Sequence, residues 1–326
     1  MQSAREIAET VLFPFALDTD RADAVPRSHL DLLAEAGLYG LAGPPDLGGV
    51  DLQSFCSVVE TLAGGCLSTA FVWIQHNTPV RTVAASKNGA LREEWLAPLC
   101  SGRRRAGIAL AALRAGPAEI EAARVEGGWV FDGDVPYVTG WGLIDVVLAA
   151  ARTPDGRVVT ALLDAEASQS LAVQRLTLMA TNASSTVRMR LRRRFVPEER
   201  VVSVEPYRPP PAYDGGGRPN GSLALGVAGR CCRLLGPSPL DAELEARRRQ
   251  LDEAAEETMA DARAAAAELA QRAATALVVR EGSRSLLPDG HAQRLAREAV
   301  FLQVFGSRPA IRAALLRRLG AAPPAT

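Results

Sequence analysis

The chain has 326 residues, with 37 basic side chains balanced by 37 acidic ones, and 48% of its residues are hydrophobic. This composition predicts a globular protein that buries a substantial core. It argues against nucleic acid and an anionic membrane surface as partners, because both require an excess of cations on one face. No segment offers the roughly 18 uninterrupted apolar residues of a membrane span, so we expect a cytoplasmic protein.

The cysteines and histidines lack the spacing of a metal site or a redox pair. The chain has five cysteines and three histidines, with no Cys-x-x-Cys and no His-x-x-x-His. We therefore expect no metal and five reduced, mostly buried cysteines. His76 and His291 have no serine or aspartate partner at the spacing of a hydrolase triad, which predicts structural roles for both.

The first 105 residues predict a set of helices. Apolar residues recur there at helical spacing between polar N-cap candidates and glycines. The expected helices run from Ser28 to Gly37, from Asp51 to Gly65, and from Ser68 through Phe71 and Ile74.

From about residue 106 to residue 202 the apolar period changes from 3.6 to 2, which predicts strands. The expected strands cover residues 129–131, 143–150, 158–163, 170–176 and 186–195. In the last of these Val187, Met189 and Leu191 alternate with Arg188, Arg190 and Arg192. The arginine row is either a phosphate clamp or a solvated sheet face, and we expect the solvated face because open antiparallel sheets usually have one.

Helices resume after a linker rich in proline and glycine, expected from residue 203 to about residue 221. Residues 240–281 contain no glycine or proline and follow a Ser238-Pro239 start signal. Two shorter helices are expected beyond, one capped by Asp289 and one opened by Pro309. The expected domains are residues 1–105, 106–205 and 206–326.

Five segments in chain order carry a resemblance to one known family. Residues 37–50 resemble its GL…PxxxGG element, and Ser68-Thr69-Ala70 with His76-Asn77 resembles its STA…HN helix. Residues 128–140, 178–197 and 297–305 resemble GYxLNGxKxWITN, LGMRGS…VRVP and RDA…YEG. The family is the acyl-CoA dehydrogenase superfamily. The resemblance implies an α+β multidomain fold with an N-terminal helical domain, a middle β-barrel or sheet domain and a C-terminal helical bundle.

The resemblance also implies a cofactor and a substrate. FAD would lie between the middle domain and the C-terminal bundle, with an acyl thioester, on coenzyme A or an acyl carrier protein, beside its isoalloxazine. An aromatic ring there packs on the flavin face, and a hydroxyl near the reactive nitrogen tunes the electron demand of the flavin. The residues implied in FAD binding are Leu110, Ala111, Tyr137, Val138, Thr139 and Gly282.

The catalytic base departs from the family pattern. Aligning Arg297-Glu298-Ala299 with RDA puts Gly306 at the position of the usual glutamate, and glycine cannot accept a proton. Asp214, in a glycine-rich loop, is the substitute candidate. Glu298 itself is expected to be a helix-end or salt-bridge residue and not a catalyst. The loop at residues 110–117 lacks the family's Thr, Glu and Asp, and no RxQFG element is recognisable in residues 234–251, which leaves retention of FAD open.

Three functions remain as hypotheses. The favoured one is a divergent FAD-dependent acyl-CoA dehydrogenase-like oxidoreductase that performs α,β-dehydrogenation of an acyl thioester. The second is a flavin-dependent monooxygenase or oxidase of the same fold, and the third is a non-catalytic partner subunit of a heteromeric acyl-CoA dehydrogenase. The expected assembly is a homodimer or tetramer, or a hetero-oligomer with an active homologue.

Overall fold

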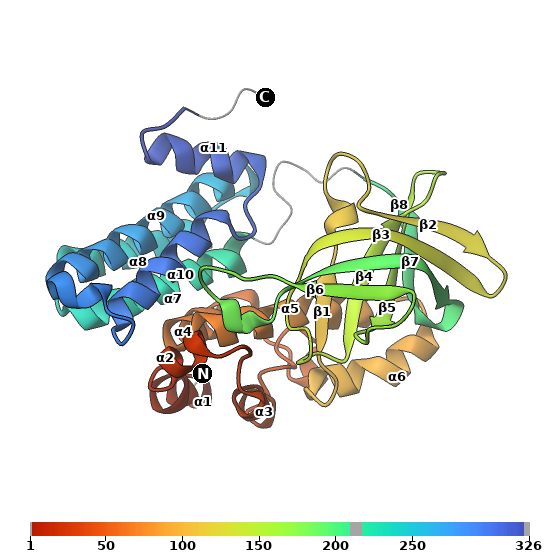
Figure 1. Cartoon of the computed structure of the whole chain (residues 1–326), viewed down its shortest axis with the longest axis horizontal. Helices are drawn as coiled ribbons and strands as arrows, with labels where there is room; N and C mark the ends of the chain where they lie inside the picture. The colour runs from red at the N-terminus through yellow and green to blue at the C-terminus, as the bar shows by residue number, and fades with distance from the viewer. Residues whose placement is uncertain (1, 209–216, 323–326) are drawn as a thin grey trace.

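The computed structural model describes residues 2–208 and 217–322, and its elements follow the expected order of helices, strands and helices (Figure 1). The N-terminal elements are α1 (Gln2–Ile7), η1 (Ala8–Leu12), α2 (Ala16–Arg21), α3 (Arg27–Glu35), η2 (Pro45–Leu47), α4 (Leu52–Gly65), α5 (Leu67–Ala84) and α6 (Gly89–Cys100). The middle elements are β1 (Ala106–Ala109), η3 (Ala111–Leu113), β2 (Ile120–Val125), β3 (Gly128–Val138), β4 (Val146–Arg152), β5 (Arg157–Asp164), β6 (Leu171–Arg175), η4 (Asn182–Ser184), β7 (Val187–Pro197), η5 (Glu198–Arg200) and β8 (Val201–Pro206). The C-terminal elements are α7 (Gly217–Leu235), α8 (Pro239–Asp252), α9 (Glu256–Glu281), η6 (Gly282–Leu286), α10 (His291–Val304) and α11 (Pro309–Arg318).

The helix caps agree with the sequence at some ends and differ at others. The Asp51 carboxylate accepts the N–H of Ser54 at 2.8 Å and caps α4 as predicted. Ser28 and Ser68 lie inside the first turns of α3 and α5, so their predicted capping roles are wrong. Asp289 is not a cap either. Its carboxylate pairs with Arg21 at 2.5 Å, and α10 begins after Gly290.

The sheet has eight strands in the order β6-β7-β3-β2-β4-β5-β8, with β1 paired to β4. The sequence pattern missed β1, β2 and β8. The prediction of a linker from residue 203 was therefore wrong at its start, because the valines that begin β8 extend a strand to Pro206. It was also wrong at its end, since α7 already begins at Gly217. Gly221 lies inside this helix, and Leu251 packs where its side chain would stand, 2.6 Å from an added Cβ.

The arginine row on β7 is a solvated sheet face with cross-strand partners. Arg188 donates to the Asp134 carboxylate of β3 at 2.6 Å, and Arg190 donates to the same carboxylate at 3.1 Å. The hydrogen bond from Arg188 is the largest of the effects that lower the pKa of Asp134. These pairs give the row a structural role on the sheet surface, as expected.

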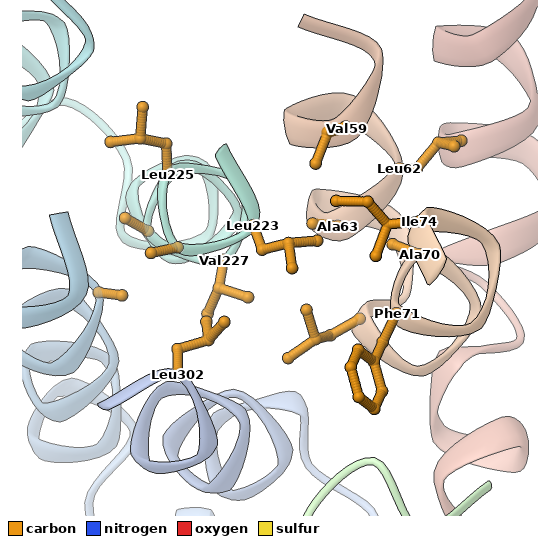
Figure 2. Close-up of a cluster of buried hydrophobic side chains, with 14 of the residues drawn as sticks. Val59, Leu62, Ala63, Ala70, Phe71, Ile74, Leu223, Leu225, Val227 and Leu302 are labelled. Carbon is orange, nitrogen blue, oxygen red and sulfur yellow. The ribbon is translucent and has the colours of Figure 1, made fainter. Parts of the chain in front are cut away.

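The N-terminal helices and the C-terminal bundle share one apolar core (Figure 2). Side chains of α4, α5, α7 and α10 meet in it, and they include Val59, Leu62, Ala63, Ala70, Phe71, Ile74, Leu223, Leu225, Val227 and Leu302. None of the helices that the structure describes is long and apolar enough to cross a membrane.

Glycines bring α4 and α7 into backbone contact inside this core. A Cβ added to Gly226 of α7 would lie 2.3 Å from the carbonyl oxygen of Glu60 and 2.8 Å from the Cβ of Ala63. A Cβ added to Gly64 would lie 3.0 Å from the carbonyl oxygen of Gly226. No side chain fits at Gly226 unless the two helices separate.

We predict that Gly226→Ala destabilises the protein by about 1–3 kcal/mol, because overpacking outweighs the gain in helix propensity. Gly229→Ala, one turn along α7, is the matched control. Its Cβ would stand 3.4 Å from Leu244, so its stability should stay within about 1 kcal/mol of the wild type. Urea unfolding of both variants measures the difference, and equal stabilities would contradict the close contact.

Candidate functional site

The strand β3 ends with the predicted residues Tyr137 and Val138, and the predicted Thr139 follows directly after it. Alternation along the strand turns Val138 into the core, whereas Tyr137 points outward and is 61% exposed. Thr139 follows the strand and is buried. An exposed aromatic ring therefore stands beside a buried hydroxyl.

The strand β1, which leads into Leu110 and Ala111, touches the end of β3. A Cβ added to Gly107 of β1 would lie 3.0 Å from the carbonyl oxygen of Thr139, so the two backbones touch. Leu110 directly follows β1, and Ala111 opens the short helix η3. Ala111 and Val138 also belong to the same buried cluster of the sheet domain. The structure thus joins the end of β3 to the strand that leads into Leu110 and Ala111.

The loop after Ala111 is fastened to the sheet by Arg152 of β4. Its Nε donates to the carbonyl oxygen of Ala112 at 2.6 Å, Nη1 donates to that of Gly116 at 2.7 Å, and Nη2 donates to that of Arg114. The guanidinium lies 3.8 Å from the ring centroid of Tyr207, whose hydroxyl also donates to Arg114. The shortened loop is therefore held by a charged side chain that the sequence motifs did not identify.

Helix α5 links the end of β3 to the C-terminal end of α10. A Cβ added to Gly140 would lie 3.5 Å from Val72. The adjacent Phe71 packs edge-on against Phe301 and Phe305, with ring centroids 5.1 and 4.8 Å away. These rings form an apolar wall directly before Gly306.

Gly306 has a left-handed backbone with φ of 59°, and an amide stands next to it. A Cβ at this position would lie 2.9 Å from Nδ2 of Asn220 on α7. Asp214, the predicted substitute base, lies outside the described residues. Asn220 is thus a neutral, non-basic neighbour of the aligned base position.

Glu298, the acidic residue nearest to Gly306 in sequence, has a structural role. Its carboxylate accepts from Nη1 of Arg294 at 2.5 Å, and both side chains are buried. Separating a buried carboxylate from its arginine partner costs free energy, because a buried charge is then left unpaired. The expected salt bridge is therefore present.

The segment between β6 and β7 crosses from the sheet to the helices (Figure 1). Nη1 of Arg297 on α10 donates to the carbonyl oxygen of Met179 at 2.9 Å, and the same guanidinium pairs with Asp20. The Met179 side chain is 61% exposed, and Val304, at the end of α10, is 70% exposed. Exposed apolar side chains therefore lie on both elements joined by Arg297.

Gly282 is not brought to this region within one chain. Nη2 of Arg263 on α9 donates to the carbonyl oxygen of Phe305 at 3.2 Å. Arg263 is therefore the residue of α9 that lies next to the candidate site. Gly282 follows α9 nineteen residues later, and a helical rise of 1.5 Å per residue puts it about 28 Å away along the axis.

His76 is a structural residue, as predicted. Its Nε2 lies 3.0 Å from the carbonyl oxygen of Leu99, and its Nδ1 accepts the N–H of Ala106 at 3.0 Å. This pattern requires a neutral ring with the proton on Nε2. Burial lowers the pKa of His76 to about 3.

Two surface hollows lie away from the predicted site residues. Within residues 2–208 and 217–322, no three side chains of the metal-binding types gather into a site. Two surface hollows of about 480 and 630 Å³ lie beside α6 and on the strands β2, β3 and β8. Neither is lined by a predicted site residue.

Comparison with known proteins identifies the family of the N-terminal domain. Residues 1–103 match the model of the acyl-CoA dehydrogenase N-terminal domain. The bovine (Bos taurus) mitochondrial short-chain specific acyl-CoA dehydrogenase is 25% identical over 215 residues, which make up 62% of this chain and 52% of that enzyme. Residues 1–103 thus carry an N-terminal domain of the acyl-CoA dehydrogenase family, and the chain is similar to that superfamily beyond it. The match spans about half the length of the bovine enzyme.

Solved structures show that the fold of this superfamily extends over the whole chain. A glutaryl-coenzyme A dehydrogenase in complex with glutaryl-CoA superimposes with a TM-score of 0.82, covering 99% of this chain and 94% of that one at 17% identity. An FAD complex of PigA superimposes with a TM-score of 0.76, covering 98% and 96% at 18% identity. These similarities establish the shared architecture.

We predict that His76 makes the stability depend on pH. The folded pKa is about 3 and the unfolded value is near 6.5, so below pH 6.5 the unfolded chain binds the proton and the folded chain does not. Stability contributed by the neutral ring is complete above pH 6.5 and is lost as the pH falls. Between pH 7 and pH 5 this loss amounts to about 2 kcal/mol.

Urea unfolding of the wild type and of His76→Asn at both pH values tests this prediction. The variant should be less stable at pH 7 and should lose about 2 kcal/mol less on acidification. Equal losses in the two proteins would show that His76 does not carry the effect.

Proposed function

We propose that the chain binds FAD where the end of β3 meets β1, α5 and α10, and that it acts on an acyl thioester as a divergent acyl-CoA dehydrogenase-like oxidoreductase. The observation that carries this proposal is the contact between β1, which leads into Leu110 and Ala111, and the Tyr137–Thr139 segment at the end of β3. The matching N-terminal domain and the shared fold with the FAD complex of PigA support it.

The residues at the proposed site fit the isoalloxazine end of FAD. Tyr137 and Met179 are exposed apolar groups of the kind that pack on a flat ring. The buried Thr139 hydroxyl supplies a polar contact. When bound, FAD supplies the hydride acceptor for oxidation of the acyl chain.

The protein side chains would bind and shield the substrate. The wall of Phe71, Phe301 and Phe305 suits an apolar acyl chain and excludes water from the region before Gly306. Proton abstraction next to the thioester carbonyl needs a basic group, and neither Gly306 nor the Asn220 amide is one. We propose Asp214 for this role.

The neutral pair of Gly306 and Asn220 also favours a second candidate, a flavin-dependent monooxygenase or oxidase, because such a reaction does not require a carboxylate at this position. The third candidate, a non-catalytic partner of an active homologue, predicts that this chain does not turn over acyl thioesters when it is purified alone.

We also propose an assembly in which Gly282 serves another subunit, as a homodimer or tetramer or as a hetero-oligomer with an active homologue. Its position about 28 Å along α9 from the site supports this arrangement. The proposed domains are residues 1–105, 106–205 and 206–326, with cytoplasmic localisation.

We predict that anaerobic mixing of the FAD-loaded protein with a panel of acyl-CoA thioesters bleaches the flavin absorbance for at least one member. Asp214→Asn should slow the bleaching by about 100-fold or more, as loss of a general base does, while FAD affinity stays the same. Asp289→Asn is the control, since that exposed carboxylate pairs with Arg21.

Bleaching at the same rate in Asp214→Asn would exclude this residue as the base. Bleaching by no thioester, together with NADH-dependent oxygen consumption, would favour the monooxygenase or oxidase. Absence of both reactions in a protein that binds FAD would favour the non-catalytic partner.

We predict that Gly306→Glu combined with Asn220→Ala raises acyl-CoA dehydrogenation. Asn220→Ala clears the amide that lies 2.9 Å from the new Cβ, while the left-handed φ of 59° costs about 1 kcal/mol of stability. The control is Gly306→Gln in the same background, which has the same shape without a base. No gain in a folded, FAD-loaded variant would mean that Gly306 does not occupy the base position or that the substrate is of another class.

A further inference from the structure

Three hydroxyl groups form a buried line at the end of β3. The Oγ of Ser184 in η4 lies 2.8 Å from Oγ1 of Thr186, which lies 3.1 Å from Oγ1 of Thr139. The three residues are 0%, 3% and 7% exposed, in the same order. The line ends at Thr139, in the region proposed for the flavin.

The turn that holds Ser184 is strained and firmly anchored. Thr181 and Ser185, on either side of η4, have φ values of 53° and 50°, which non-glycine residues seldom adopt. The carbonyl oxygen of Ser184 accepts the N–H of Gly140 at 2.9 Å, which ties the turn to the residue after Thr139. Backbone strain of this kind persists where the surroundings impose it, and it is frequent at functional sites.

The burial of Ser184 sets the direction of the hydrogen bonds. Each hydroxyl has one proton to donate. If Ser184 donates to Thr186 and Thr186 donates to Thr139, the hydroxyl protons of Ser184 and Thr186 are both hydrogen-bonded. The hydroxyl proton of Thr139 then points away from Thr186, toward the region proposed for the flavin. In the opposite direction the Ser184 proton needs another acceptor, and among the described residues its Oγ has Thr186 as its hydrogen-bond partner. A buried donor without an acceptor is costly, so the outward direction is favoured.

We infer that Ser184 and Thr186 are positioning residues that hold Thr139 as a hydrogen-bond donor toward a ligand acceptor at the end of β3. The inference rests on the proposed function, in which that acceptor is a ring nitrogen or carbonyl oxygen of the flavin. A donor stabilises the electron density that such an acceptor gains on reduction. The line therefore strengthens FAD binding and raises the midpoint potential of the bound flavin.

The experiment measures FAD affinity by fluorescence quenching, the midpoint potential of the bound flavin and the melting temperature of the FAD-free protein. The variants are Thr139→Val, Thr186→Val, Thr186→Ser and Ser184→Ala. Thr61→Val is the matched control, because it removes a hydroxyl that donates within α4, to the carbonyl oxygen of Ser57.

Thr139→Val and Thr186→Val should weaken FAD binding about three- to tenfold, the effect of one lost hydrogen bond, and Thr186→Val should lower the midpoint potential. Thr186→Ser keeps the hydroxyl and should restore both values. Ser184→Ala removes the hydroxyl that fixes the direction of the hydrogen bonds but leaves Thr186 in contact with Thr139. It should therefore weaken FAD binding less than Thr186→Val does. Thr61→Val should leave affinity and potential unchanged.

The outcomes separate the inference from the proposed function. A wild-type protein that does not bind FAD overturns the proposed function. Binding by the wild type that weakens in Thr139→Val but not in Thr186→Val overturns the hydroxyl line and leaves the proposed function standing. Equal loss in Thr186→Val and Thr186→Ser, with matching drops in melting temperature, also overturns it, because packing would then be responsible.

Discussion

The close approach of α4 and α7 is the constraint on which the rest of the structure depends. Gly64 and Gly226 let the two backbones touch, which merges the N-terminal helices and the C-terminal bundle into one core. Helix α5 extends from this core to the edge of the sheet, where Phe71 contacts the end of α10. The candidate site therefore sits at the junction of the sheet with a single helical body.

The candidate site has supporting elements, called the frame here, that suit FAD, but it differs from the family pattern at its centre, the proposed position of the catalytic base. The frame is the end of β3, supported by β1, together with the segment between β6 and β7, which Arg297 joins to α10 at the carbonyl oxygen of Met179. At the proposed centre, Gly306 lies beside the Asn220 amide, and the alignment we propose puts this glycine where the family pattern has an acid. A site of this kind retains features suited to binding a ring and an apolar chain, and it must obtain any proton acceptor from another segment.

The sequence predicted the order of elements well because helical periodicity and capping are local signals. Asp51 and Pro309 illustrate this, since each lies at the start of the helix it predicts. Strands such as β8 and caps such as that of α10 were missed, because a short strand needs a neighbour to define it and Asp289 is drawn to Arg21. The roles of Arg152 and Thr186 depend on contacts with residues distant in sequence, and no sequence motif indicates them.

The account depends most on FAD binding at the end of β3. The direct measurement is a titration of the purified protein with FAD, followed by the visible absorbance of the flavin, in the wild type and in Tyr137→Ala. The account predicts a saturable, perturbed flavin spectrum for the wild type and weaker binding for the variant, which loses the exposed ring. An unperturbed spectrum at high FAD concentration, or equal binding by the two proteins, would contradict it.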